Sequence, residues 1–327
     1  MRKRSIFLLS TLALAGAVYL NNTSLLSNRP DGKPVLLAHR GLAQEYDRTG
    51  LTGDTCTAER MLAPRHDYLE NTLRSMDAAF ARGADVLELD VHPTTDGKFA
   101  VFHDWTVDCR TEGSGETRSH SMADLRKLDV GYGYTADGGK TFPFRGQGVG
   151  LMPALDEVLD RFPNRRFHIN IKSNDEKEGE ALAAFLSGLP AERRAALTVV
   201  GGDRPVLAVK AALPDMRTLS KKSLTRCLLR YQGLGWSGYV PEDCRGGTLF
   251  VPINIAPWLW GWPNRFLDRM ESVGTNVYLL GPYHGGGFSD GIDDPAVIDA
   301  LPEGYSGGIS TDALDLVMPA IERRAAN

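Results

Sequence analysis

Short apolar runs of strand length alternate with segments of helical periodicity from residue 34 to the C-terminus. Residues 34–38 predict a first strand, residues 71–82 an amphipathic helix that ends at Gly83, and residues 85–92 a second strand. Later strands are predicted at 99–102, 166–171, 197–200, 216–219, 249–255, 276–280 and 308–310. Later helices are predicted at 121–128, 153–162, 178–186, 205–213, 224–231, 264–273 and 313–324.

Strands that each lead into a helix predict an α/β fold with a parallel sheet, and about eight such units favour a closed (β/α)₈ TIM barrel. No glycine-rich fingerprint follows the first strand, which argues against a dinucleotide-binding sheet. The strand at 99–102 is interpreted as an excursion from the loop after the second strand. Long loops at 42–69, 107–151 and 256–263 each follow a strand, so we expect them on the C-terminal face, where barrel enzymes build active sites.

Two features of these rim loops leave alternatives open. Trp258, Trp260 and Trp262 form either a lid or lipid-facing lip, or a cover over the helix below. The run 285–287 is all glycine and is interpreted as a mobile rim loop rather than a phosphate cradle, because no helix clearly starts there.

The 327 residues and the formal net charge of −4 are typical of a globular protein and argue against a nucleic-acid partner, which would usually require a basic chain. Residues 1–22 have a basic start, an apolar stretch and small residues at Ala15-Gly16-Ala17, which predicts a signal peptide or an N-terminal anchor. We therefore expect a single domain at 33–327 that is exported to the periplasm or the extracellular space. Membrane association through the N-terminal segment is the alternative to its cleavage.

In an exported chain the four cysteines are expected to form disulfides, because disulfides persist in oxidising compartments. Cys56 and Cys109 lie in predicted loops on the same rim, and Cys227 and Cys244 flank a glycine-rich loop. We predict the pairs Cys56–Cys109 and Cys227–Cys244, one of three connectivities that four cysteines allow.

Polar residues alternate along the second predicted strand. Glu88, Asp90 and His92 share one face because side chains two apart on a strand point the same way. Neighbouring buried carboxylates repel each other, and a divalent cation relieves that repulsion; oxygen ligands favour Mg²⁺ or Ca²⁺. The alternative is a structural ion network in which both carboxylates pair with Arg40 and Lys172.

Groups suited to acid–base chemistry and anion binding stand beside these carboxylates. His39 ends the first strand and His103 precedes a rim loop, and histidine titrates near neutral pH. One imidazole can accept a proton from the attacking hydroxyl or water while the other donates one to the leaving group. Arg40 has a planar fork that suits phosphate oxygens, and Lys172 adds a point charge.

The chain resembles the glycerophosphodiester phosphodiesterase family of phospholipase C-like TIM barrels. The motifs that carry the resemblance are Ala38-His39-Arg40-Gly41, Glu70-Asn71-Thr72, Glu88-Leu89-Asp90-Val91-His92, Phe102-His103-Asp104 and Gly308-Ile309-Ser310-Thr311-Asp312. The resemblance implies a (β/α)₈ fold and divalent-cation-dependent cleavage of a small-molecule or lipid-derived phosphodiester.

By this resemblance, His39 and His103 are the acid–base pair, Glu88 and Asp90 bind the cation, and Arg40 contacts the phosphate. Glu70 is expected at the same site, as a ligand or beside the ligands, and Lys172 in substrate binding. The third-strand motif departs from the family's glutamate and reads Ile169-Asn170-Ile171-Lys172, so Asn170 is the expected third ligand and binding of the cation should be weaker.

The predicted activity is hydrolysis of glycerophosphodiesters to an alcohol and glycerol 3-phosphate. A phospholipase D-like activity on lysophospholipids at a membrane is the second hypothesis, motivated by the rim tryptophans and the N-terminal segment. A non-catalytic binding barrel is the third, and only Asn170 supports it.

Overall fold

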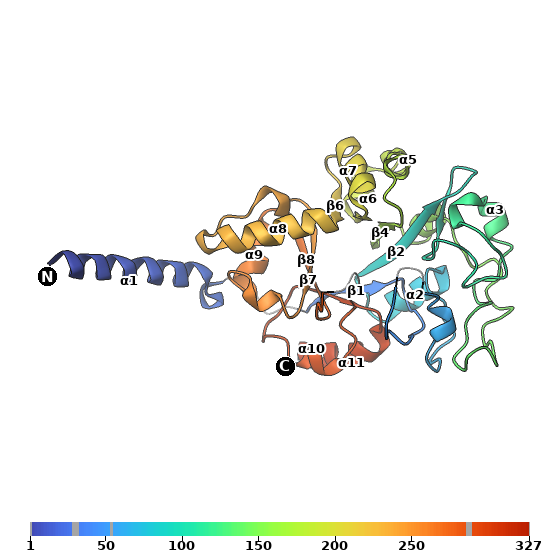
Figure 1. Cartoon of the computed structure of the whole chain (residues 1–327), viewed down its shortest axis with the longest axis horizontal. Coiled ribbons are helices and arrows are strands. Elements are labelled where there is room, and N and C mark those ends of the chain that lie inside the picture. Colours follow the sequence, from blue (N-terminus) through green and yellow to red (C-terminus); the bar gives the residue numbers. More distant parts are fainter. Residues whose placement is uncertain (1, 28–32, 53–54, 286–289, 327) are drawn as a thin grey trace.

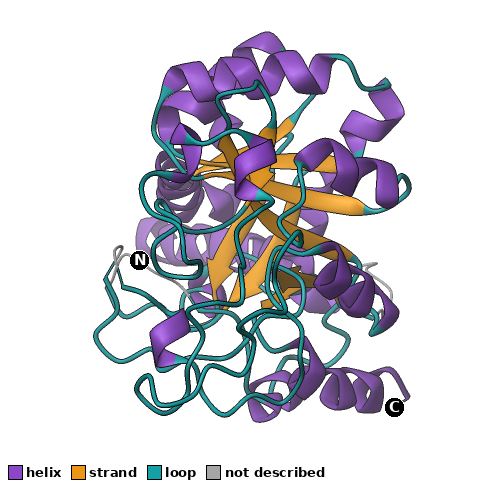
Figure 2. Ribbon diagram, turned by 90° about the vertical axis from the view of Figure 1, so that its right-hand side faces the viewer, coloured by secondary structure: helices purple, strands orange, loops and turns teal. Residues whose placement is uncertain are grey.

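The computed structural model describes residues 2–27, 33–52, 55–285 and 290–326, and Gly286 and Gly287 of the predicted glycine loop lie outside this part of the chain. It confirms the (β/α)₈ barrel (Figures 1 and 2). The barrel strands are β1 (Val35–His39), β2 (Val86–Pro93), β4 (Arg166–Ile171), β5 (Leu197–Gly201), β6 (Arg217–Ser220), β7 (Thr248–Pro252), β8 (Asn276–Leu280) and β9 (Gly308–Thr311). All of their pairings are parallel, in the order β6-β5-β4-β2-β1-β9-β8-β7.

The helices cover the outside of this sheet in Figure 1. Those that follow barrel strands include α2 (Leu73–Ala81), α4 (Leu155–Arg161), α5 (Glu176–Ser187), α7 (Asp203–Ala212), α8 (Lys221–Leu234), α9 (Asn264–Ser272) and α11 (Leu314–Ala326). Shorter helices are α3 (Met122–Leu125), α6 (Ala191–Ala195) and α10 (Pro295–Asp299). The sequence pattern missed α6 and α10, which are both only five residues long.

The strand β3 (Phe99–Val101) is the predicted excursion, because it pairs antiparallel with the end of β2 and lies off the barrel path. The barrel strands at the two ends of the path are β6 and β7, and no hydrogen-bonded ladder joins them in the described chain. They approach where a Cβ on Gly247 would lie 2.8 Å from the carbonyl oxygen of Thr218, so only glycine fits there. The barrel is therefore nearly closed. In the described chain, β6 and β7 are neighbours without backbone pairing between them.

Side chains alternate along β2 as predicted, with apolar residues on one side of the strand and carboxylates on the other. Leu87, Leu89 and Val91 are fully buried in the main core between the sheet and its helices. Glu88 and Asp90 project to the opposite side, into the barrel. Burial of the apolar set against the helices therefore fixes the direction of the two carboxylates.

Both predicted disulfides are present. Cys56–Cys109 joins the loop after β1 to the loop after β3, and Cys227–Cys244 joins α8 to a short 3₁₀ turn before β7. On the chain-entropy account, closing their 53- and 17-residue separations stabilises the fold by about 4 and about 3 kcal/mol.

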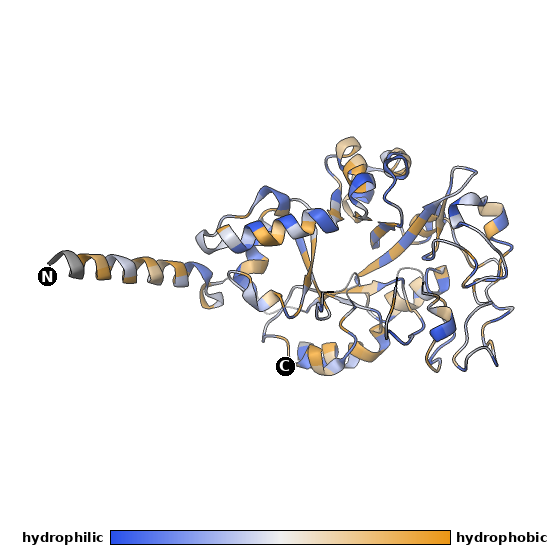
Figure 3. Cartoon of the chain, viewed as in Figure 1, coloured by the Kyte–Doolittle hydropathy of each residue, from blue (hydrophilic) through white to orange (hydrophobic). Residues whose placement is uncertain are grey.

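The N-terminal helix α1 (Arg2–Asn22) carries mostly apolar residues and extends away from the barrel (Figures 1 and 3). Its C-terminal end is tied to the barrel, where the Asn22 amide donates to the Trp236 carbonyl at 2.8 Å and Arg269 donates to Asn22 at 3.0 Å. Within the described residues, no helix combines the length and the apolar character that crossing a membrane requires.

Three rings pack against one another inside the barrel. His168 is buried against Phe250 and Tyr278, with ring centroids 5.7 and 5.2 Å apart. Burial, together with the charges of Arg166 and Arg217, lowers the pKa of His168 to about 3. The fold therefore holds this imidazole neutral.

Replacing His168 is expected to make the fold less sensitive to acid. The unfolded side chain titrates near pH 6.5, so the unfolded state binds more protons between pH 6.5 and 3, and the free energy of unfolding falls as the pH drops through this window. In His168→Leu, the difference in unfolding free energy between pH 7 and pH 4.5, measured by urea unfolding, should shrink by about 2–3 kcal/mol. The exposed His284→Leu is the control, and an equal acid response in both variants would contradict the prediction.

Candidate active site

The carboxylates of β2 meet the ends of its two neighbours. The ladders place His39 of β1 beside Glu88, and Asn170 of β4 beside Asp90. Asp90 has no exposed surface and Glu88 is 5% exposed. These groups therefore converge inside the C-terminal end of the barrel, as the alternation along β2 predicts.

Positive and amide groups surround Asp90. Arg40 Nε and Lys172 Nζ each lie 3.3 Å from its carboxylate oxygens, and the amides of Asn71 and Asn170 each donate to it at 3.0 Å. Burial opposes ionisation, but Lys172, His103 and Arg40 outweigh it and hold the pKa of Asp90 well below its usual range. Asp90 is therefore a fixed negative charge with its own partners.

Glu88 is held much less firmly. Its Oε2 lies 3.5 Å from His39 Nε2 and has no hydrogen-bond partner among the described residues. Burial and the neighbouring charge of Asp90 raise the pKa of Glu88 to about 7. A buried carboxylate with an unsatisfied oxygen is the feature here that most calls for a bound cation.

A strained turn after β1 places Arg40. Arg40 and Asn71 both have left-handed backbones, with φ of 60° and 58°, which non-glycine residues rarely adopt. The Arg40 N–H donates to the Glu88 carbonyl and the Asn71 N–H to the Arg40 carbonyl, each at 3.0 Å. These bonds hold the strain in place, as is common at functional sites.

His39 is oriented by the last barrel strand. Its Nδ1 forms a hydrogen bond with Asp312, which follows β9, and Arg48 of the first long loop lies 2.7 Å from the other Asp312 oxygen. Burial and Arg40 lower the pKa of His39, but Glu88 and Asp312 outweigh them, so the net pKa lies above its ordinary value. His39 is about one-third exposed, so it is accessible from the rim.

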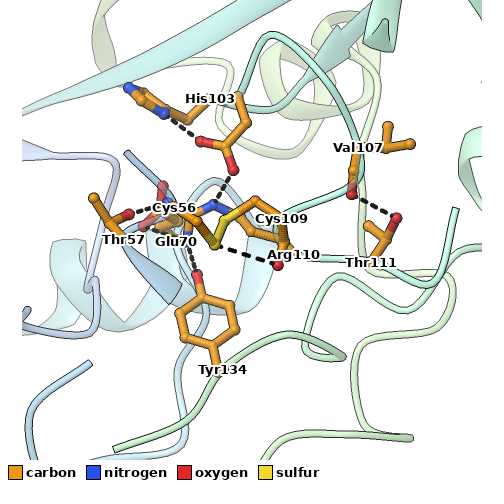
Figure 4. The surroundings of a disulfide bond; sticks show 10 residues. Cys56, Thr57, Glu70, His103, Val107, Cys109, Arg110, Thr111 and Tyr134 are labelled. Atoms are coloured by element: carbon orange, nitrogen blue, oxygen red, sulfur yellow. Dashed lines mark hydrogen bonds and ion pairs between the residues drawn. A yellow bond between two sulfur atoms is a disulfide. The ribbon is translucent and has the colours of Figure 1, made fainter. Parts of the chain in front are cut away.

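His103 is oriented in a similar way by a different carboxylate. Its Nδ1 lies 2.7 Å from Asp104, whose second oxygen is 2.9 Å from Arg110 Nε (Figure 4). Burial, followed by the charge of Arg40, lowers the pKa of His103 to about 4. The pKa values of the two imidazoles are therefore shifted in opposite directions.

The buried Arg110 connects His103 to the rest of the site. It lies 3.4 Å from Glu70, whose other oxygen accepts a hydrogen bond from Arg40 at 3.0 Å. Thr57 accepts from Arg110 at 2.7 Å, and the disulfide that joins the residues beside them, Cys56 and Cys109, fixes both segments (Figure 4).

The two histidines belong to one site. The charges of both imidazoles lower the pKa of Asp90, and the carbonyl of Asp90 accepts the backbone N–H of Phe102, the residue before His103, at 3.1 Å. His39 ends β1 and His103 lies in the segment after β3. Glu88, Asn170, Asp312 and His39 also line the inner end of a cavity of about 890 Å³.

The donor set suits a hard divalent cation. Glu88 offers an unpartnered oxygen, and Asn170 donates its amide N–H to Asp90, so its carbonyl oxygen lies on the other side of the amide. Among the described residues, no three His, Cys, Asp or Glu side chains are grouped to hold a metal. Asn170 stands where the family-type motif has a glutamate.

Sequence reasoning missed three residues that position the histidines. In the sequence, Asp312 stands out only as the last residue of the closing-strand motif, whereas Arg48 and Arg110 carry no signal of their own. Arg110 directly follows Cys109, so the predicted disulfide was the one clue that this loop lies against the site. Glu70 lies where expected, but its contacts are with Arg40 and Arg110.

The rim tryptophans divide between the two interpretations. Trp258 is 75% exposed and lines the cavity. Trp260 donates to the Gln232 carbonyl at 2.9 Å, and Trp262 packs against Phe266. The first therefore belongs to the rim and the other two cover the barrel.

Comparison with known proteins confirms the resemblance that the motifs indicate. Residues 39–185 match the Glycerophosphoryl diester phosphodiesterase family. A glycerophosphodiester phosphodiesterase of Bacillus subtilis is 37% identical over 145 residues, which cover 41% of this chain and 48% of that protein. Human glycerophosphodiester phosphodiesterase 1 is 36% identical over 150 residues, 42% of this chain and 43% of that protein. The match thus spans about half the length of these relatives.

Solved structures share the fold over nearly the whole chain. The glycerophosphodiester phosphodiesterase of Agrobacterium tumefaciens has a TM-score of 0.57 at 20% identity, covering 88% of this chain and 99% of that one. An Oleispira antarctica phosphodiesterase in complex with the product sn-glycerol-3-phosphate has a TM-score of 0.55 at 19% identity, covering 88% and 97%. At these identities the likeness establishes the barrel.

Neutralising Asp312 is expected to lower the pKa of His39, because the carboxylate stabilises the imidazolium. The pKa of His39 in Asp312→Asn should fall relative to the wild type when its ring protons are followed by NMR through a pH titration. Asp299→Asn, which removes an exposed aspartate of α10, is the control. An unchanged His39 titration in Asp312→Asn would show that Asp312 does not position this histidine.

Proposed function

We propose that the protein is a phosphoric diester hydrolase that cleaves glycerophosphodiesters to an alcohol and glycerol 3-phosphate. One observation carries this proposal: two histidines, each held by its own aspartate, both act on the buried carboxylate of Asp90, and His39 also lies 3.5 Å from Glu88. The family match over residues 39–185 and the product named for the Oleispira structure support the substrate class.

In this proposal the histidines move protons on either side of the phosphate. His39 and His103 act as the acid–base pair, one receiving the proton of the attacking oxygen and the other supplying the leaving alkoxide. The nucleophile is water or the neighbouring hydroxyl of the glycerol. Asp312 and Asp104 keep each ring in one orientation through its Nδ1, which leaves each Nε2 directed away from that carboxylate.

Arg40 and Lys172 supply positive charge for the phosphoryl oxygens. Lys172 is one-fifth exposed and therefore accessible to a ligand, whereas Arg40 is almost buried between Glu70 and Asp90. Glu88, Asp90 and Asn170 would hold Ca²⁺ or Mg²⁺. When bound, the cation would neutralise negative charge that gathers on the phosphoryl oxygens.

We further propose that the chain is exported, periplasmic or extracellular, and that its N-terminal segment is either removed or retained as a membrane-associated anchor. The basic start and apolar stretch of residues 1–22 support export. Two disulfides support an oxidising compartment.

Removing either histidine is expected to abolish most hydrolysis of glycerophosphocholine while the fold is retained. His39→Ala and His103→Ala should each lower kcat by about 10²–10⁴-fold, and a chelator should suppress the wild type. His120→Ala, which alters a histidine outside the site, is the control, and circular dichroism checks the fold. Full activity after replacement of both histidines would refute the mechanism, and no turnover of any phosphodiester by the wild type would favour a binding barrel.

Restoring a third carboxylate is expected to strengthen cation binding. Asn170→Glu adds a negative charge beside Glu88 and Asp90, so the Kd for Ca²⁺ or Mg²⁺ should fall by at least about tenfold in calorimetric titration. Asn174→Glu, on the loop after β4, is the control for a general change in charge. If Asn170→Glu leaves the Kd unchanged, Asn170 does not lie at the cation site.

A further inference from the structure

The cavity that opens beside His39 and Glu88 is polar at one end and apolar at the other. Its inner end is lined by His39, Glu88, Asn170 and Asp312. Its outer part is lined mainly by apolar side chains of α8 and of the segment after β7, including Leu224, Leu228, Leu229, Ile255, Trp258 and Leu259. We call this outer part the apolar groove.

The groove runs along the boundary between β6 and β7, the two neighbouring strands of the described barrel that are not paired with each other. Leu219 and Ser220 of β6 line one side, and Phe250 and Pro252 of β7 line the other. Because no hydrogen-bonded ladder joins these strands in the described chain, side chains rather than paired backbone form the wall here. The disulfide that starts at Cys227 ties α8 to the turn before β7.

The outer end of the groove presents large apolar side chains to solvent. Leu229 is 69% exposed and Trp258 is 75% exposed, on opposite walls. Leu224 and Leu228, one helical turn apart on α8, are half-buried behind this opening. An apolar surface of this kind, continuous with a polar reaction site, is suited to one ligand that has both characters.

We propose that the apolar groove binds the single acyl chain of an amphiphilic glycerophosphodiester, a lysophospholipid, whose phosphate lies at the histidine pair. This inference rests on the proposed function and specifies its substrate class. The cavity volume of about 890 Å³ lies within the range of pockets that enclose one small ligand. Continuity between the groove and the acidic end favours an acyl chain of the substrate over a separate protein or membrane partner.

The test compares glycerophosphocholine with lysophosphatidylcholines of increasing chain length, all kept below the concentration at which micelles form. If the groove holds the chain, kcat/KM should rise about two- to fourfold per added methylene and then level off once the groove is filled. A kcat/KM that is independent of chain length, or that rises only when vesicles are added, would overturn the proposal.

Variants in the groove wall make the test specific. Leu228→Gln should lower kcat/KM for the long-chain substrate at least tenfold more than for glycerophosphocholine, and Thr225→Trp should shorten the chain length at which kcat/KM levels off. Leu207→Gln, which changes an exposed leucine of α7 outside the groove, should leave the ratio at its wild-type value. Equal losses on both substrates in the two groove variants would contradict the assignment.

Binding measurements separate this inference from the proposed function. Alkylphosphocholines carry a phosphodiester and one hydrocarbon chain, and calorimetry reports their binding without turnover. Affinity that rises with chain length and falls in Leu228→Gln supports the groove even if neither glycerophosphocholine nor any lysophosphatidylcholine is hydrolysed, a result that would refute only the proposed function. Hydrolysis of glycerophosphocholine without any chain-length effect in either assay would refute only the groove.

Discussion

The geometry of the site depends most on the ion pairs that the buried guanidinium of Arg110 forms. It lies between Glu70 and Asp104, and through them it links Arg40 on one side to His103 on the other. A buried charge of this kind is costly unless it is fully paired, so its carboxylate partners have little freedom to move. The loop that carries His103 is therefore fixed relative to β2, although it is not itself part of the barrel.

The two carboxylates inside the barrel differ in how many partners they have, and this difference determines the chemistry of the site. Asp90 has two cations and two amides as partners, whereas Glu88 has one unpartnered oxygen. Removing water from a carboxylate without replacing its partners raises its pKa, as found for Glu88. A structural ion network accounts for Asp90 but leaves the unpartnered oxygen of Glu88 unexplained, and a bound cation would satisfy that oxygen.

The fold and the inward-facing residues were predictable because local rules determine them. Alternation along β2 places Glu88 and Asp90 together, and the strand–helix period of the whole chain specifies the barrel. The partners that orient the histidines were not predictable, because Arg48 and Arg110 reach the site from irregular loops whose paths depend on tertiary contacts. The groove could not be foreseen either, since it depends on which two neighbouring strands lack a ladder.

The most direct measurement of the central claim is a crystal structure of the protein with glycerol 3-phosphate and Ca²⁺ or Mg²⁺ bound. The account predicts the phosphate between the imidazoles of His39 and His103, with the cation against Glu88 and Asp90. A phosphate bound away from both rings, or a cation coordinated elsewhere while Glu88 keeps no ligand, would contradict it.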